Sequence, residues 1–273
     1  MKFIDIHSHV QFVAYEPDRE AVMMRAKEAD KAMINVGTQK DTSKAAVELA
    51  HQHPDIAWAT IGLHPIHTSK SFHDKQELGG EGKDFTSRGE EFDYDYYLEL
   101  GKDPRVVGIG ECGLDYYRLT EETKKKQHEV FIQQIELANE LGKPLMLHIR
   151  DAYEDALKLL SAISHKLSAP GNVHFFAGDW NIAKQFLDLG FTLSFTGVLT
   201  FTKDYDEVVK NTPLDMILTE TDSPYITPVP LRGKRNEPVN VKYVVQRIAE
   251  LKNLPVEEVQ QAVVKNAKRV FGI

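Results

Sequence analysis

Two histidines near the start of the chain stand in a pattern that can hold a metal ion. His7 and His9 belong to the run KFIDIHSH, whose alternating apolar residues predict a β-strand over residues 2–9. Side chains two apart on a strand point to the same face, so both imidazoles can bind one divalent ion. The pair alone is weak evidence, because a chain this rich in histidine contains about 0.4 such pairs by chance.

A second histidine pair, His51 and His53, is predicted not to form a metal site. It directly precedes Pro54 at the end of a predicted helix, and a predicted strand follows it. Residues two apart on a helix diverge by about 200°. The two rings are therefore expected to point away from each other.

More potential ligands lie at the ends of other predicted strands. They occur in the stretches GIGECG, PLMLHIR, NVHFFAG and LTETDSP, and they are Glu111, His148, His174 and Asp222. If the strands form a barrel, their C-terminal ends meet on one rim. Together with the first histidine pair, these six side chains exceed the ligand number of one tetrahedral zinc but suit two ions that share a carboxylate. Taken singly, a strand-end histidine is also typical of a hydrogen-bonded core, and Asp222 before Ser-Pro is typical of a turn.

Eight short apolar stretches alternate with longer amphipathic segments. One such segment, residues 121–142, places Phe131, Ile135 and Ala138 on one helix face and ends at Gly142. Eight strand-then-helix units predict a single-domain (β/α)8 TIM barrel over residues 1–273, with a doubly wound open sheet as the alternative. The predicted strands are residues 2–9, 31–37, 56–62, 106–113, 144–150, 172–178, 191–197 and 215–222.

The alternation breaks over residues 66–90, which are rich in glycine and charge. This segment is longer than most connections that lack secondary structure. We interpret it as an insertion, either a solvated one or a lid over the strand ends. Its residue types specify no ligand.

The composition excludes several classes of protein. With 42% hydrophobic and 27% charged residues the chain is typical of a globular protein. Its longest apolar run is four residues, far below the about 20 that a membrane span needs. Asp5 and His7 interrupt the N-terminus where a signal peptide needs apolar residues, and the single Cys112 cannot form an internal disulfide. We therefore predict a cytoplasmic protein with no membrane association and no obligatory protein partner.

Seven sequence blocks together resemble a known enzyme family. The blocks HSH, GECGLDYY, LHIRDA, VHFFAGD, SFTG, TETDSPY and RGKRNEP occur in this order between residues 7 and 238. They resemble the signature blocks of the TatD family of metal-dependent deoxyribonucleases, within the amidohydrolase-like barrel superfamily. The chain departs from the family at Phe175, where cysteine is usual, and its connection after His64 is longer than expected for the family.

The resemblance implies a site for two divalent metal ions, which are Mg, Mn or Zn. The shared ligand is Glu111, a permanent carboxylate where several amidohydrolases have a carboxylated lysine, and this favours the TatD branch. The first ion is held by His7, His9, Glu111 and Asp222, and the second by His148, His174 and Glu111.

Two divalent ions about 3.5 to 4 Å apart can activate a bridging water for phosphodiester hydrolysis. Asp222, expected beside the first ion, is the candidate general base. Two ions carry +4 while Glu111 and Asp222 carry −2, which leaves a formal charge of about +2 to attract a phosphate. Asp5 shares the strand face of His7, where it either orients a ligand histidine or is simply a buried polar residue.

His64 and Arg150 are candidates for substrate binding. His64 ends the third predicted strand in GLHP, and Arg150 follows the ligand histidine of the fifth strand by two residues. Both can contact a phosphate or leaving group. The alternatives are a structural hydrogen bond for His64 and an ion pair of Arg150 with Asp151 or Asp155.

The segment LRGKRNEP after the last predicted strand adds two more candidates, Arg232 and Arg235. Barrels often bind phosphate near the loops that follow strands 7 and 8. The alternative is a solvated loop in which Glu237 neutralises one cation. The net charge of −8 argues against a broad basic surface for a long duplex, but it allows such a local cationic site.

Three functions are consistent with this sequence. The first, which the resemblance implies, is a deoxyribonuclease with DNA as its substrate, trimming strand ends. The second is a small-molecule amidohydrolase, lactonase or phosphoesterase of the same superfamily. The third, a metal-binding scaffold without turnover, is disfavoured by Asp222 and the complete ligand set. Because the same ions hydrolyse either kind of bond, only substrate profiling separates the first two.

Overall fold

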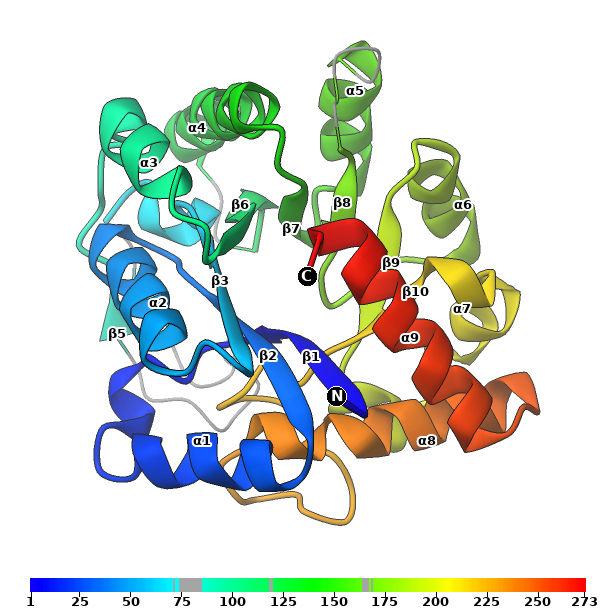
Figure 1. Ribbon diagram of the computed structural model, residues 1–273. Coiled ribbons are helices and arrows are strands. Elements are labelled where there is room, and N and C mark those ends of the chain that lie inside the picture. The colour runs from blue at the N-terminus through cyan, green and yellow to red at the C-terminus, as the bar shows by residue number, and fades with distance from the viewer. Residues whose placement is uncertain (71, 74–84, 118–119, 164–166, 168) are drawn as a thin grey trace.

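The computed structural model describes residues 1–273 except 71, 74–84, 118–119, 164–166 and 168. Eight parallel strands form one sheet in the order β1-β2-β3-β6-β7-β8-β9-β10, with helices on its outside (Figure 1). The strands are β1 (Phe3–Ser8), β2 (Lys31–Val36), β3 (Ala57–Ile61), β6 (Val106–Asp115), β7 (Leu145–Arg150), β8 (Gly171–Val173), β9 (Thr192–Phe195) and β10 (Ile217–Thr219).

The first and last strands meet, which closes the sheet into a barrel. Asp222 N donates to His7 O at 2.9 Å, and His9 N donates to Ser223 O at 2.9 Å. The predicted single-domain (β/α)8 TIM barrel is confirmed, and the open doubly wound sheet is not formed. Each of the eight predicted strands is present, because each is a short apolar run that a barrel buries on both faces.

Helices connect the strands and cover the barrel. The N-terminus of α4 is capped by Thr120, whose side chain accepts a hydrogen bond from Thr123 N, and the helix stops at Gly142, where φ is 63°. Only glycine adopts this left-handed conformation without steric cost. The helices are α1 (Arg19–Glu28), α2 (Lys40–Gln52), α3 (Tyr94–Gly101), α4 (Glu121–Leu141), α5 (Tyr153–Ile163), α6 (Trp180–Asp188), α7 (Asp206–Asn211), α8 (Val241–Lys252) and α9 (Val256–Phe271), with 3-10 turns at 13–15, 65–67, 197–200, 214–216 and 238–240.

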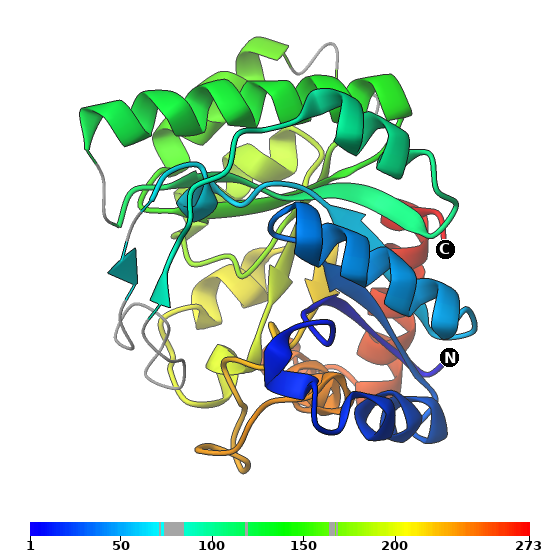
Figure 2. The ribbon, with the colours of Figure 1, turned by 90° about the vertical axis from the view of Figure 1, so that its left-hand side faces the viewer.

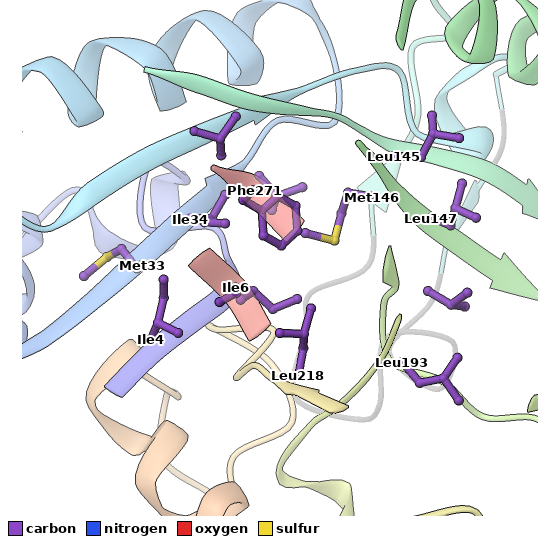
Figure 3. Close-up of a cluster of buried hydrophobic side chains, with 14 of the residues drawn as sticks. Ile4, Ile6, Met33, Ile34, Leu145, Met146, Leu147, Leu193, Leu218 and Phe271 are labelled. Carbon is purple, nitrogen blue, oxygen red and sulfur yellow. The ribbon is translucent and has the colours of Figure 1, made fainter. Parts of the chain in front are cut away.

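The hydrophobic core joins the strands to the surrounding helices. Figure 3 shows part of it, with side chains from β1, β2, β7, β9 and β10. Phe271, in the last turn of α9, belongs to the same cluster and is 4% exposed. This core makes the barrel a rigid support for the residues at its rim.

The predicted insertion at 66–90 contains a short antiparallel pair, β4 (Phe72–His73) with β5 (Phe85–Thr86). Glu90 N donates to His67 O at 2.8 Å, which fixes the two ends of the segment together. Residues 71 and 74–84, about half of the segment that we interpret as a solvated stretch or a lid, lie outside the described residues. Across the described part of the chain, no helix is both long and apolar enough to cross a membrane.

Candidate metal centre

The C-terminal ends of the strands surround a cavity of about 480 Å³. β1 supplies His7 and leads into His9, β6 supplies Glu111 and β7 supplies His148. His174 follows β8 directly, and Asp222 follows β10 by three residues. The structure thus brings all six predicted ligands together. Five of them line the cavity, and the sixth, His7, is completely buried next to His9 and Glu111.

The first cluster of donor atoms gathers at the end of β1. His7 Nε2 lies 3.2 Å from His9 Nε2 and 3.3 Å from Glu111 Oε2. Asp222 Oδ1 lies 3.8 Å from His7 Nε2 and 3.5 Å from His9 Nε2. Ligands of a tetrahedral ion with bonds of about 2.1 Å are separated by about 3.4 Å. The donor types and their spacing therefore fit one divalent ion.

The second cluster gathers around the other oxygen of the same carboxylate. Glu111 Oε1 lies 3.0 Å from His148 Nδ1, 3.2 Å from His174 Nε2 and 3.2 Å from His64 Nε2. The two oxygens of Glu111 thus face different sets of imidazoles. This arrangement is typical of a carboxylate that bridges two metal ions.

Hydrogen bonds behind three imidazoles determine which ring nitrogen is free. His9 Nδ1 lies 2.8 Å from Val36 O, His148 Nε2 lies 2.8 Å from Asp115 Oδ2, and His174 Nδ1 lies 3.1 Å from Glu220 Oε1. Each acceptor holds a proton on the outer nitrogen, so the neutral ring presents a lone pair to the cluster. Asp115 and Glu220 are therefore candidate site residues that the sequence did not identify as histidine partners, although both lie inside the resemblance blocks.

His64 differs from these three histidines because it points a protonated nitrogen, and not a lone pair, toward the cluster. Its Nδ1 accepts a hydrogen bond from Ile66 N at 3.2 Å, and burial lowers the pKa of His64, so its ring is neutral. The single proton must then be on Nε2, which faces Glu111 Oε1. By spacing alone His64 could share an ion with Glu111 and His148, but the proton on its Nε2 favours a role as hydrogen-bond donor at the rim of the second cluster.

The backbone around Asp222 is held in an unusual conformation. Asp222 has φ of 53°, in the left-handed region that β-strand residues avoid. The side chain of Asn236, fully buried, donates to Thr221 O at 3.0 Å and to Tyr225 O at 2.7 Å. These bonds hold both sides of the turn and direct the Asp222 carboxylate toward the first cluster.

Asp5 contacts backbone groups and the Thr221 hydroxyl rather than an imidazole. Its Oδ1 accepts from His7 N at 3.2 Å and from Thr221 N at 2.9 Å. Of the two roles open from the sequence, Asp5 therefore acts as a buried link between the first and last strands. His7 Nδ1, by contrast, has no hydrogen-bond partner among the described residues, and the His7 ring stacks on His174 at 3.7 Å.

Neighbouring charges divide the histidines into neutral and protonated ones. Burial lowers the pKa of His7 to about 3. Burial opposes the charge on His148 as well, but hydrogen bonds to Asp115 and Glu111 outweigh it and raise the pKa of His148 to about 9. Burial would raise the pKa of Asp115, but its hydrogen bond with His148 outweighs burial and lowers that pKa to about 2. Without metal, His148 is thus protonated at neutral pH, and a bound ion must displace that proton.

The predicted arginines lie in different surroundings. Arg150 lines the cavity, and its guanidinium stacks on the Tyr117 ring at 3.8 Å. Arg232 and Arg235 are not among the described residues that line the cavity. Arg232 stacks on Phe201 at 4.3 Å, while Arg235 makes a two-pronged ion pair with Asp18 at 2.8 and 2.7 Å.

Apolar and aromatic side chains make up much of the cavity lining, which the sequence did not indicate. Three of them, Phe175, Ala177 and Tyr225, lie inside the resemblance blocks, but no sequence signal distinguishes Tyr205. A flat apolar group can pack against such side chains while its charged end reaches the metal clusters. This apolar lining is formed by Phe12, Ile66, Ile149, Phe175, Ala177, Tyr205, Tyr225 and Ile226.

The second histidine pair takes no part in this site. His51 Nε2 contacts Asp103 at 2.8 Å, and His53 Nε2 contacts Glu20 at 3.2 Å. The separate partners agree with the prediction that these rings point apart.

Comparisons with known proteins agree with this geometry. A family model described as TatD related DNase matches residues 4–272. The chain is 39% identical to the uncharacterized metal-dependent hydrolase YabD of Bacillus subtilis, with 98% of each chain covered. It is 34% identical to YcfH of Escherichia coli, another uncharacterized metal-dependent hydrolase, with 100% and 97% covered. The crystal structure of YjjV, a TatD homologue from E. coli, superimposes with a TM-score of 0.83 at 27% identity, covering 100% of this chain and 98% of YjjV.

Proposed function

This chain belongs to the TatD-related DNase family and is a metal-dependent hydrolase, and from this premise we propose that it is a deoxyribonuclease that hydrolyses phosphodiester bonds in DNA. The observation that carries the proposal is the position of the Glu111 carboxylate between the two clusters. Its Oε2 faces the first cluster and its Oε1 faces the second, and Glu111 lines a cavity to which aromatic side chains also contribute.

The proposal includes two divalent ions, Mg, Mn or Zn. Such ions, when bound, lower the pKa of a water and stabilise charge on an attacked phosphate. His7, His9 and Asp222 would hold the first ion, His148 and His174 the second, and Glu111 would contact both. The histidine partners Asp115 and Glu220 keep the inner nitrogens of their rings available for this role.

The chain's own residues would divide the remaining chemistry. Asp222, at the edge of the first cluster, takes the proton from the attacking water. His64 donates its Nε2 proton to an oxygen of the phosphate or leaving group, since its Nδ1 is already occupied by Ile66 N. Arg150 neutralises the phosphate, and its stacking on Tyr117 holds the guanidinium plane in place.

Charge balance makes the role of Arg150 important. The sequence-based sum counted two carboxylates, but Asp115 and Glu220 contact the clusters as well. Four carboxylates at −4 offset two divalent ions at +4, so the expected surplus of about +2 disappears. The attraction for a phosphate must then come from directed groups, which are Arg150 and His64.

The apolar lining of the cavity supports DNA as the substrate class. A nucleotide combines a phosphate, which the clusters attract, with a flat base, which the aromatic side chains Phe12, Phe175, Tyr205 and Tyr225 can accommodate. We infer that a strand end is the part of the DNA that enters this cavity. The alternative is a small-molecule amidohydrolase, lactonase or phosphoesterase, whose substrate would place another flat group against the same side chains.

The decisive experiment is substrate profiling with controlled metal. The protein is stripped with chelator and then supplied with Mg, Mn or Zn separately. Each form is assayed on end-labelled single- and double-stranded DNA, and on a panel of amides, esters, lactones and a small phosphodiester. We expect metal-dependent shortening of DNA from an end. Efficient turnover of a lactone or amide with DNA left intact would instead establish the small-molecule alternative.

A further inference from the structure

α4 lies against the outside of the barrel (Figure 2), and two of its buried residues are glutamines, Gln127 and Gln134. Gln127 is 5% exposed and Gln134 is fully buried. They are seven positions apart, which is two helical turns, so both side chains project from the same face. Burying an amide costs free energy unless its donors and acceptors are satisfied. The partners of these two amides therefore explain why glutamine stands here.

Each glutamine binds both backbone groups of a single residue. Gln134 Oε1 accepts from Leu63 N at 2.8 Å, and Gln134 Nε2 donates to Leu63 O at 2.9 Å. Gln127 Oε1 accepts from Asp115 N at 2.8 Å, and Gln127 Nε2 donates to Asp115 O at 2.8 Å. These paired bonds replace a neighbouring strand, because the pairing of β3 with β6 ends at Ile61 and Ile109.

Both residues that are bound in this way lead directly to the candidate site. Asp115 Oδ2 contacts His148 Nε2 at 2.8 Å. Leu63 immediately precedes His64, whose backbone N donates to Thr38 O at 2.9 Å. The two amides thus fix the backbone at the two points from which the second cluster and its hydrogen-bond donor are built.

We propose that Gln127 and Gln134 are positioning residues, through which α4 sets the orientation of His148 and His64 respectively. Gln127 acts on His148 by way of Asp115, and Gln134 acts on His64 by way of Leu63. This inference rests on the proposed roles of His148 as a ligand and His64 as a donor. A shift of about 1 Å at such a site costs about 100-fold in rate.

The role of Gln127 is tested by measuring metal binding to the variant Gln127→Leu. His148→Ala, which removes a proposed ligand, is the reference. Gln133→Leu, which changes an exposed neighbour on α4, is the control. Mn²⁺ affinity and stoichiometry are measured by calorimetry. We expect Gln127→Leu to weaken the second ion by about 10- to 100-fold, as loss of an outer partner usually does, while the first ion is unaffected. Gln133→Leu should bind both ions as the wild type does.

Gln127→Glu keeps the shape of the side chain if the leucine variant fails to fold. The introduced carboxylate, when ionised, would face Asp115 O with like partial charge, whereas its protonated form can donate to that oxygen. The loss of affinity for the second ion in Gln127→Glu, measured against the wild type at the same pH, should therefore become smaller as the pH falls. The titratable groups near this position are Lys124, His128, Asp115, Tyr116 and Asp155, and they are common to both proteins.

Gln134 is tested by a double-mutant cycle with His64. Gln134→Leu should lower kcat while both ions remain bound, because His64 is a donor and not a ligand. In a His64→Ala background the same change should have no further effect on kcat. Equal effects of Gln134→Leu in both backgrounds would overturn the role assigned to Gln134.

The remaining outcomes separate this inference from the proposed site. If Gln127→Leu folds and binds both ions with wild-type affinity while His148→Ala loses one, the positioning role of Gln127 is wrong and the ligand assignment stands. If His148→Ala also keeps both ions, the ligand assignment is wrong and the positioning role fails with it.

Discussion

Glu111 is the residue on which the two clusters depend most directly. It is 4% exposed, and imidazoles approach both of its oxygens. Burial alone would raise its pKa, but the charge on His174 and the hydrogen bond from His148 are among the effects that outweigh burial and hold the pKa of Glu111 well below its ordinary value. The carboxylate is therefore ionised whenever the protein is folded near neutral pH, ready to contact two cations.

Replacing Glu111 by Ala should abolish turnover and lower the metal content, because no other carboxylate faces both clusters among the described residues. Metal content is measured by elemental analysis, and folding by thermal melting. Glu122→Ala, an exposed glutamate in the first turn of α4, is the control and should leave both properties unchanged. An active Glu111→Ala protein, or full activity in excess chelator, would remove the two-metal interpretation.

Asp222 is expected to contribute a proton-accepting step beyond its contact with the first cluster. Asp222→Asn keeps the size and one oxygen of the side chain but cannot accept the proton of the water. We expect much of the metal to remain and kcat to fall by about 100- to 10,000-fold. The exposed Asp188→Asn serves as control. Normal turnover by metal-loaded Asp222→Asn would mean that another group is the base.

At the scale of elements, the loop after β10 is tied to the beginning of α1. Arg235 pairs with Asp18 and its guanidinium stacks on Tyr15 at 4.4 Å. The hydrogen bonds of Arg235 lower the pKa of Asp18. Glu237, which the sequence offered as a neutralising partner, lies farther from Arg235 at 3.5 Å and pairs with Arg25 at 2.8 Å. The phosphate contact expected of Arg232 stays a prediction, whereas for Arg235, which is paired with Asp18, we now expect none.

Single replacements of the two loop arginines distinguish DNA binding from local stability. Arg232→Gln should lower DNA affinity and reduce the salt dependence by about one unit of slope, as loss of one phosphate contact does. Arg235→Gln should leave the slope unchanged and cost no more than about 1 kcal/mol of stability, since its ion pair is partly exposed. Binding is measured against salt, and stability by denaturant. A reduced slope for Arg235→Gln would show that it leaves Asp18 to contact phosphate.

At the scale of the whole molecule, the barrel buries the candidate metal ligands together at one end. The clusters use residues from β1, β6 and β7 and from segments after β8 and β10. A metal ion therefore connects distant parts of the chain that the unfolded state cannot hold together. Metal binding is accordingly expected to contribute to the stability of the fold.

Chelation should lower the melting temperature, and the effect of metal should grow with pH. The raised pKa of His148, about 9, stabilises the metal-free fold below the ordinary histidine pKa of about 6.5, and this contribution is lost as the pH rises toward 9. Below pH 9 an ion must displace that proton, so metal affinity should rise between pH 6 and 9. Calorimetry with Mn²⁺ in buffers of different ionisation enthalpy should detect at least one proton released per protein at pH 7. Proton release of zero with pH-independent affinity would contradict this assignment.

The sequence by itself determined the strands of the barrel and the residues at its rim. Strand alternation is a local property, so an apolar run such as KAMINV and the placement of His7 and His9 on one face follow from neighbouring residues alone. The barrel rule then places Glu111 and Asp222 on the same rim without any knowledge of contacts. Fold and ligand types were predictable for this reason.

Only the tertiary structure decided which side chains act on which. The proton position on His64 depends on Ile66 N, and the free nitrogen of His148 depends on Asp115. Arg235 is paired with Asp18, more than 200 positions away in the chain. Hydrogen bonds and ion pairs are set by ångström-scale distances between segments remote in sequence, and these distances exist only once the barrel closes.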